Sequence, residues 1–162
     1  MKLLKKIEFF LKIMEKKNKK LCIVESCTGG LLASLITSIP GSSKVLDFGL
    51  VTYSNESKIL LAKIPRKKIE KFGAVSDEVA TLMAKNILKL SPKNYLSISC
   101  TGIAGPKGGN KVKPVGTVFV SLCFNDISKT FHKKFYKLDR KKIQLKTSEF
   151  MIDEGIKMIL NN

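Results

Sequence analysis

A hydroxyl and a thiol stand side by side in the run Glu25–Gly30, where a strand is expected to turn into a helix. The apolar run Leu21–Val24 before it is short and β-like, and apolar residues at helical spacing follow it. A turn of this kind directs backbone N–H groups and the positive end of a helix toward one point. Ser26 or Cys27 could therefore attack a carbonyl group there, with backbone N–H groups holding the developing negative charge.

The same residues also fit a purely structural role. Ser26 or Thr28 could cap the following helix, because serine and threonine accept hydrogen bonds from the free N–H groups at a helix start. Gly29 and Gly30 would then only permit the turn. The residue types leave both interpretations open.

Several familiar catalytic and phosphate-binding signatures are absent from the chain. The glycine-rich runs lack the spacing of an NTPase loop and of a dinucleotide-binding loop, and no serine is followed by lysine three residues later. His132 is the only histidine and lies in a strand-like segment, so we expect it to be structural or solvent-facing rather than part of a Ser-His-Asp triad. A serine nucleophile here needs another base, and lysine is the known substitute.

Lys58 is the best-placed lysine for that role. It falls in the first turn of a short helix expected directly after a strand, where the positive helix end and burial both disfavour a protonated amine. To act as a base near neutral pH, its pKa must fall by roughly 3 units from about 10.4, at a cost of about 4 kcal/mol of folding stability. On position alone, the alternative is an ordinary solvated lysine.

Helices and strands alternate along the chain, and both glycine-rich loops follow strands. Ser76 and Asp139 are expected helix caps, and Asn125-Asp126 marks the turn of a hairpin. The expected helices lie within 1–20, from 31 to about 38, from 54 to about 62, over 66–72, from 76 to before 92 and from 139 to about 159, and the expected strands cover 20–24, 45–53, 95–100, 115–124 and 128–136.

This order of elements predicts an α/β fold in which helices are layered on a mixed β-sheet, because one hairpin interrupts an otherwise alternating pattern. In folds of this class, the loops at the carboxyl ends of strands form the site. With 162 residues, the chain is expected to be a single domain over residues 1–162.

The formal net charge of +17 raises the alternative of a nucleic-acid-binding protein. Only Arg66 and Arg140 are arginine, and lysine lacks the planar fork that reads bases. The lysines are spread over every segment, which favours a general compositional bias over a binding patch. We therefore expect no specific nucleic-acid partner, and at most weak, salt-sensitive binding to polyanions.

The use of cysteine and histidine argues against a metal site, because the four cysteines form no C-x-x-C pair and there is one histidine. No apolar run is long enough to span a bilayer, so no membrane association is expected. Glu8, Lys12 and Glu15 interrupt the apolar N-terminal segment, which is unlike a signal peptide. Free thiols in such a chain favour the cytoplasm.

Six short motifs occur together in a specific order. They are Glu25-Ser-Cys-Thr-Gly-Gly30, Gly41-Ser-Ser43, Tyr53-Ser-Asn-Glu56 with Lys58, Gly73-Ala-Val-Ser76, Thr101-Gly-Ile-Ala-Gly-Pro106 and Pro114-Val-Gly-Thr117. In these motifs and their spacing the chain resembles the CinA C-terminal domain family over nearly its whole length. The resemblance implies a three-layer α/β/α sandwich with a mixed β-sheet.

The resemblance further implies a Ser/Lys amidohydrolase that converts nicotinamide mononucleotide to nicotinate mononucleotide and ammonia, with no cofactor and no metal. Ser26 matches the family's nucleophile and Lys58 matches its base. Tyr53 and Thr101 are candidates to orient Lys58 or to relay protons, and packing at strand ends is the alternative for both.

The expected substrate contacts follow from the same match. Backbone N–H groups from Cys27 to Gly30 are expected to hold the oxyanion, and glycines in the second loop are expected to let its backbone approach the ribose phosphate. Arg140 is expected to contact the phosphate. The substrate-binding set is Cys27, Thr28, Gly29, Gly30, Asn55, Gly102, Ile103, Gly105 and Arg140.

The chain departs from the family pattern at a few places. Gln144 stands near the position where the family often carries a second arginine, and Cys100 and Lys107 are also unusual. The expected partners are a small-molecule nucleotide substrate and further copies of the chain in a homo-oligomer. Two other function classes stay open: a CinA-like protein that binds a nucleotide or a partner without turnover, and a basic nucleic-acid-associated protein.

Overall fold

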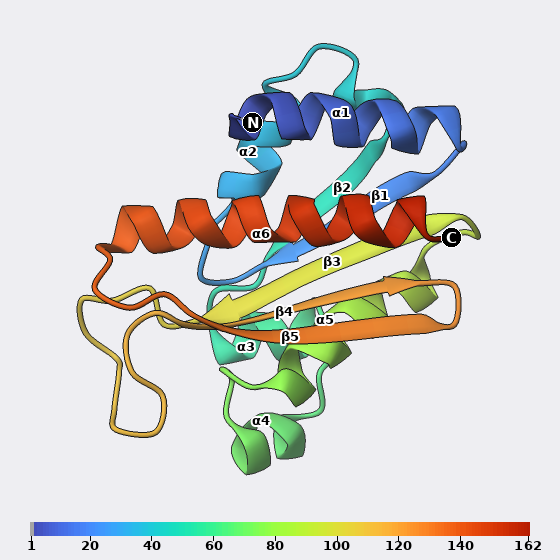
Figure 1. The fold of residues 1–162 in the computed structure, drawn as a ribbon. Helices are drawn as coiled ribbons and strands as arrows, with labels where there is room; N and C mark the ends of the chain where they lie inside the picture. The colour runs from blue at the N-terminus through green and yellow to red at the C-terminus, as the bar shows by residue number, and fades with distance from the viewer. Residues whose placement is uncertain (1) are drawn as a thin grey trace.

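Five strands form one mixed sheet in the computed structural model, which describes residues 2–162 (Figure 1). The strands are β1 (Lys20–Glu25), β2 (Leu46–Val51), β3 (Tyr95–Gly102), β4 (Thr117–Phe124) and β5 (Ile127–Lys134), in the spatial order β2-β1-β3-β4-β5. β1 pairs in parallel with β2 and β3, whereas the β3–β4 and β4–β5 pairs are antiparallel. The expected mixed sheet with one hairpin is confirmed.

Helices cover both faces of this sheet and complete the three-layer α/β/α sandwich. One layer holds α1 (Leu3–Lys16), α2 (Leu31–Thr37) and α6 (Arg140–Leu160), and the other holds α3 (Asn55–Leu60), α4 (Arg66–Phe72) and α5 (Asp77–Leu90). In Figure 1 the long α6 crosses the sheet on the side of α1, and α5 lies on the other side.

The burial of β1 explains why helices form two layers. Leu21 and Ile23 belong to the apolar cluster shared with α1 and α6, whereas Cys22 and Val24 pack with residues of α5. A strand covered on both faces has no solvent side, so it reads as a continuous apolar run in the sequence. β2, at the edge of the sheet, instead alternates half-buried and exposed residues.

The helix boundaries follow the caps read from the sequence. Ser76 and Asp139 each accept the backbone N–H of the residue three positions later, at the starts of α5 and α6. β3 continues two residues beyond the expected strand 95–100, and a short 3-10 helix, η1 (Ser42–Lys44), precedes β2. A helix of three residues is too short to show a periodic pattern in the sequence.

α1 is the amphipathic helix that its spacing predicts. Its apolar residues pack under α6, and Lys6 forms ion pairs of 2.9 Å with Glu149 and Asp153 on that helix. No helix among residues 2–162 is long and apolar enough to cross a membrane.

The sheet topology brings three connecting segments to one edge. Because β1, β2 and β3 run in parallel, their carboxyl ends lie at the same edge of the sheet. The turn 26–30 follows β1, residues 52–54 follow β2, and the loop 103–116 follows β3. Both glycine-rich loops and the start of α3 therefore meet at one place, as is usual for sites in α/β folds.

Candidate active site

The side chains of Ser26 and Lys58 are in contact inside the protein, at the carboxyl ends of β1 and β2. Lys58 Nζ lies 2.8 Å from Ser26 Oγ, although the residues are 32 positions apart in the sequence. Only 6% of the surface of Ser26 and 2% of that of Lys58 is exposed, so Lys58 is not a solvated lysine. A hydroxyl and an amine at this distance can exchange a proton directly, which is what a nucleophile and its base require.

The segment between β2 and α3 places Lys58 there. Ser54 caps α3 through reciprocal hydrogen bonds with Ser57, which set the start of the helix just before Lys58. The Lys58 amine then reaches back and donates to the carbonyl oxygen of Thr52 at 2.7 Å. Glu25 and Val51, the last residues of β1 and β2, are paired in the sheet, so the next residues, Ser26 and Thr52, lie next to each other.

Burial is the main reason that the pKa of Lys58 lies below its ordinary value, because a charged amine loses hydration inside the protein. The expected contribution of a helix start is wrong, since Lys58 is the fourth residue of a six-residue helix and lies in its last turn. A lowered pKa increases the neutral fraction of the amine at a given pH. Lys58 is therefore better able to accept a proton than an exposed lysine is.

Glu25 organises the turn that presents Ser26. Its buried carboxylate accepts three backbone N–H groups at 2.9–3.1 Å, those of Gly30, Leu32 and Ala33. These are free N–H groups at the start of α2. Glu25 thus does the capping that the sequence assigns to Ser26 or Thr28, and that structural interpretation is wrong because neither side chain caps the helix.

Cys27 points into the core. Its Sγ lies 4.0 Å from Cys100 Sγ, and Thr28 Oγ1 lies 3.1 Å from the same Cys100 sulfur. The contact with Cys100 and burial raise the pKa of the Cys27 thiol well above its ordinary value. Because the thiolate is the nucleophilic form, Cys27 is poorly suited to attack a carbonyl, whereas Ser26 is in contact with a base.

A cavity of about 270 Å³ includes Ser26 and Lys58 in its wall. Most residues selected from the sequence line this cavity, and these are Ser26, Cys27, Tyr53, Asn55, Lys58, Thr101, Gly102, Ile103, Gly105 and Arg140. Thr28, Gly29 and Gly30 are not part of the wall. The structure therefore does not place these three where a substrate contact is expected.

The turn offers fewer oxyanion donors than the sequence suggests. The N–H of Gly29 donates to the Ser26 carbonyl, and the N–H of Gly30 donates to Glu25. Cys27 lines the cavity, and its N–H donates to no other residue in the described part of the chain. The N–H of Thr28 also donates to no other residue there, but Thr28 does not line the cavity, so the N–H of Cys27 is the candidate donor for a negatively charged oxygen.

Tyr53 and Thr101 line the cavity but do not hydrogen-bond to Lys58. The Tyr53 hydroxyl accepts a hydrogen bond from Arg140 Nη2 at 2.6 Å, and Thr101 Oγ1 donates to the Ala74 carbonyl at 2.8 Å. The expected direct role of both residues in orienting Lys58 is therefore not seen. The Thr52 carbonyl holds the amine instead.

Arg140 joins the start of α6 to the loop after β3. Its Nη1 donates to the Gly105 carbonyl at 2.7 Å. Gly105 has a φ of +79°, and a Cβ there would lie 2.5 Å from a methyl carbon of Val115. A Cβ at Gly102 would lie 2.8 Å from the Thr117 carbonyl oxygen. Glycine is therefore needed at these two positions so that the loop can pack against residues 115–118. The sequence instead predicts that these glycines let the backbone approach a phosphate.

The structure adds residues that were not selected from the sequence. Ala74, Val75, Ala104, Lys107 and Gly108 also line the cavity. Gln144 Nε2 donates to the Cys27 carbonyl at 2.9 Å and so holds the turn. Glu25 could have been selected from the sequence, because it is an acidic residue at the end of an apolar strand. Thr52 could not, because it contributes only its backbone carbonyl.

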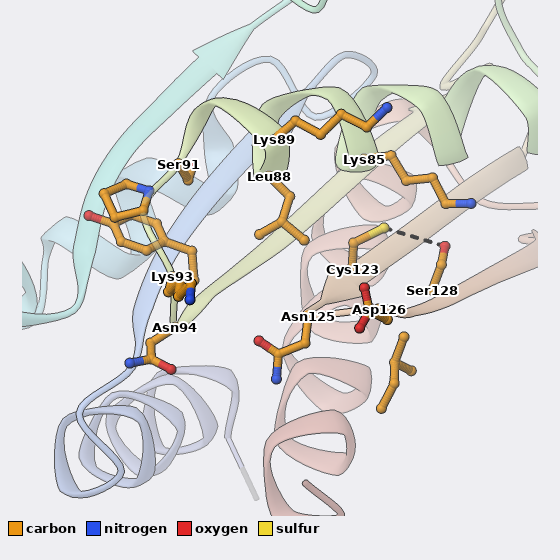
Figure 2. Close-up of a pocket in the computed structure, with 13 residues that line it drawn as sticks. Lys85, Leu88, Lys89, Ser91, Lys93, Asn94, Cys123, Asn125, Asp126 and Ser128 are labelled. Atoms are coloured by element: carbon orange, nitrogen blue, oxygen red, sulfur yellow. Dashed lines mark hydrogen bonds between the residues drawn. The ribbon is translucent and has the colours of Figure 1, made fainter.

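A larger cavity, of about 730 Å³, lies at the other end of the sheet, between the end of α5 and the β4–β5 hairpin (Figure 2). Its wall includes Lys85, Lys89 and the Cys123 thiol, which is hydrogen-bonded to Ser128 at 3.3 Å. Burial raises the pKa of Cys123. Among the described residues no lysine or histidine hydrogen-bonds to this thiol, so the larger cavity lacks the paired groups found at Ser26.

His132 lies on β5 and stacks on the Phe119 ring, with 4.4 Å between ring centroids. His132 is also exposed, so it is both packed against a ring and solvent-facing, which fits the expectation for this residue. Within the described residues, no group of three His, Cys, Asp or Glu side chains could hold a metal ion.

Comparisons with known proteins give the family of the chain. The model of the CinA C-terminal domain family matches residues 4–159. A CinA-like protein of Prochlorococcus marinus is 46% identical over 135 residues, which are 83% of this chain and 31% of that protein. The chain spans about a third of the length of the curated relatives it matches.

Solved structures agree in fold. The competence/damage inducible protein CihA of Agrobacterium tumefaciens is 32% identical, with a TM-score of 0.92 over 99% of this chain and 96% of that one. A competence or damage-inducible protein of Enterobacter asburiae is 26% identical, with a TM-score of 0.92 over 98% and 99% of the two chains. With its sequence match, its α/β/α sandwich and its motifs in agreement, the chain belongs to the CinA C-terminal domain family.

Proposed function

We propose that this domain hydrolyses a carboxamide by a Ser/Lys mechanism, and that its substrate is nicotinamide mononucleotide. The products are nicotinate mononucleotide and ammonia. The proposal is carried by the 2.8 Å contact between Ser26 Oγ and the buried Lys58 amine, whose pKa burial lowers. The family resemblance supplies the identity of the amide.

In the first half-reaction, neutral Lys58 takes the proton of Ser26 while Oγ attacks the carboxamide carbon. The N–H of Cys27 donates to the resulting oxyanion. The C–N bond then breaks, Lys58 returns the proton to the nitrogen, and ammonia leaves an acyl ester on Ser26. The Thr52 carbonyl accepts one N–H of Lys58 throughout, which keeps its lone pair directed at Ser26.

In the second half-reaction, water attacks the ester carbon and Lys58 accepts its proton. The ester C–O bond breaks, the proton passes to Ser26 Oγ, and the product leaves as a carboxylic acid, which loses its remaining proton to solvent. One water is consumed and one ammonia is released, so no electrons are transferred and no co-reactant other than water is needed. The same amine acts as base and acid in both halves.

The charges of the cavity wall support an anionic substrate. Lys107 and Arg140 line the cavity beside the neutral Lys58, and no aspartate or glutamate among the described residues does. A wall with cationic groups alone raises the local concentration of anions such as a nucleotide phosphate.

Ammonia release from nicotinamide mononucleotide tests the proposal directly. Wild type should turn over, and Ser26→Ala and Lys58→Met should each lose at least about 10³-fold in rate, as expected for removal of a nucleophile or its base. Lys67→Met, which removes an exposed lysine of α4, is the matched control and should keep full activity.

Two results would contradict the proposal. Activity that survives in Ser26→Ala would remove the serine mechanism. A folded wild type that binds nicotinamide mononucleotide without releasing ammonia would show a binding protein without turnover.

A further inference from the structure

Lys107 is a cation in the wall of the cavity that contains Ser26. It lies in the loop between β3 and β4, and among residues 2–162 its amine makes no hydrogen bond or ion pair. Apart from the buried Lys58, the cations of the wall are Lys107 and Arg140. Since no carboxylate lines the cavity, these two charges are available to an anionic ligand.

Arg140 is already held in position. Its Nη1 and Nη2 donate to the Gly105 carbonyl and to the Tyr53 hydroxyl, at 2.7 and 2.6 Å. A guanidinium has five N–H donors, so several remain for a ligand. A side chain that is fixed in advance loses less conformational entropy when it binds.

The loop that carries Lys107 is also fixed. A Cβ at Gly105 would lie 2.5 Å from a Val115 methyl carbon, and a Cβ at Gly109 would lie 2.6 Å from the Val115 nitrogen. The segments on both sides of Lys107 are therefore packed closely against Val115. Because Gly105 also accepts the hydrogen bond from Arg140, the backbone at Lys107 has a defined position relative to the guanidinium.

Gln144, four residues after Arg140 on α6, adds no positive charge to the cavity. It is neutral, and its amide donates to the Cys27 carbonyl in the nucleophile turn. α6 therefore contributes Arg140 alone to the cavity wall, and Lys107 contributes the other peripheral cation from a different element.

We propose that Lys107 and Arg140, the two peripheral cations of one cavity wall, together bind the phosphate of a mononucleotide. Arg140 offers a planar set of donors and Lys107 adds a compact charge, a combination suited to a phosphate dianion. The 5′-phosphate then becomes a determinant of specificity against nucleosides. This inference rests on the proposed function for the identity of the nucleotide, and the phosphate site can be tested without turnover.

Calorimetric titration of the Ser26→Ala protein measures the site in the absence of reaction. The ligands are nicotinamide mononucleotide, nicotinamide riboside and inorganic phosphate. In this background Lys107→Gln should weaken the mononucleotide about tenfold, equivalent to about 1.4 kcal/mol, and leave the riboside unchanged. Lys111→Gln is the matched control, because it removes an exposed charge of the same loop that does not line the cavity, and it should have no effect.

The remaining outcomes of the titration separate the proposed phosphate site from the proposed amidohydrolase activity. Equal affinity of the Lys107→Gln and Lys111→Gln proteins for the mononucleotide, or an equal loss for the riboside, overturns the phosphate site. The phosphate site is also overturned if the Ser26→Ala protein binds neither the mononucleotide nor inorganic phosphate. Lys107-dependent binding by a protein whose wild type releases no ammonia leaves the phosphate site standing and removes the amidohydrolase.

Discussion

At the scale of single residues, the environment of one amine governs the chemistry that this domain can carry out. Lys58 is enclosed by protein, with its Nζ in contact with the Thr52 carbonyl and Ser26 Oγ. These two contacts use two of the three hydrogen-bonding positions of the amine and do not replace the hydration of a charge. The burial that favours the neutral, basic form of Lys58 must therefore also lower the stability of the fold.

Replacing Lys58 by methionine should stabilise the domain while it abolishes activity. The pKa of Lys58 is lower in the folded than in the unfolded state, so unfolding takes up protons between the two values and the stability of wild type rises with pH there. The gain in Tm for Lys58→Met is therefore expected to be largest at acidic and neutral pH and to shrink toward about pH 10.4, the unfolded value. Calorimetric melts from pH 5 to 10 measure this.

Lys67→Met is the control for these melts, because Lys67 is exposed and should show no such pH trend. A Lys58→Met protein that is less stable than wild type at neutral pH would show that packing of the lysine stem outweighs the burial of its amine.

The thiol beside the nucleophile should be dispensable. Cys27 faces Cys100, and its raised pKa keeps it protonated, so Cys27→Ser is expected to keep activity within about tenfold of wild type. Mass spectrometry after treatment with iodoacetamide should show slow labelling of Cys27 at neutral pH. Loss of activity in Cys27→Ser as large as that in Ser26→Ala would instead point to a cysteine nucleophile.

At the scale of elements, the geometry of the site depends on the turn between β1 and α2. Gly30 has a φ of +94° and is followed by the seven-residue helix α2. The carboxylate of Glu25, five residues before Gly30, accepts the free N–H groups at the start of this helix. The carboxylate lies almost entirely out of solvent and accepts backbone N–H groups from three residues. Glu25 is therefore a positioning residue for Ser26, although it does not contact the base.

Glu25→Gln should disturb this turn, because the amide NH₂ of glutamine must then face a backbone N–H. The expected loss is about 1–3 kcal/mol of unfolding free energy, the cost of leaving buried donors unsatisfied. If the turn positions Ser26, kcat should fall while KM changes little. Urea titration and steady-state kinetics measure the two effects.

Glu56→Gln serves as the comparison for Glu25→Gln, since Glu56 is exposed and its contact with Arg66 is 4.0 Å long. Equal stability of the two variants would mean that the Glu25 hydrogen bonds do not hold the turn.

At the scale of the whole molecule, strand order and surface charge have separate consequences. The order β2-β1-β3 sets three carboxyl ends side by side and so assembles the cavity from segments that are far apart in the sequence. Most of the 30 lysine and arginine residues behind the net charge of +17 lie outside the cavity wall, which holds Lys58, Lys107 and Arg140. The site determines recognition of a small molecule, whereas the surface charge determines non-specific attraction.

Binding to random-sequence DNA should therefore be weak, independent of sequence and highly sensitive to salt. Fluorescence anisotropy should show affinity falling at least about tenfold between 50 and 200 mM salt, because the attraction comes from the release of counterions. Ser26→Ala should bind DNA as wild type does. A preferred sequence, or binding that persists at 200 mM salt, would favour the nucleic-acid-associated alternative.

The amino-acid sequence by itself determined the elements of this protein and the place of its two glycine-rich loops. The apolar runs at 20–24 and 95–100, the cap at Ser76 and the hairpin turn at Asn125-Asp126 all depend on local chemistry, so they were visible without the structure. The motifs also pointed to Ser26 and Lys58. Position alone did not single out either residue; the resemblance of the six motifs to the family selected both.

Only the tertiary structure decided which of these groups touch. The contacts of Ser26 with Lys58 and of Arg140 with Tyr53 join residues 32 and 87 positions apart. They exist because β1 lies between β2 and β3, an order that local periodicity does not encode. The capping by Glu25 and the carbonyl of Thr52 also required the folded backbone, since a side chain that reaches back over a turn and a backbone acceptor leave little trace in a pattern of residue types.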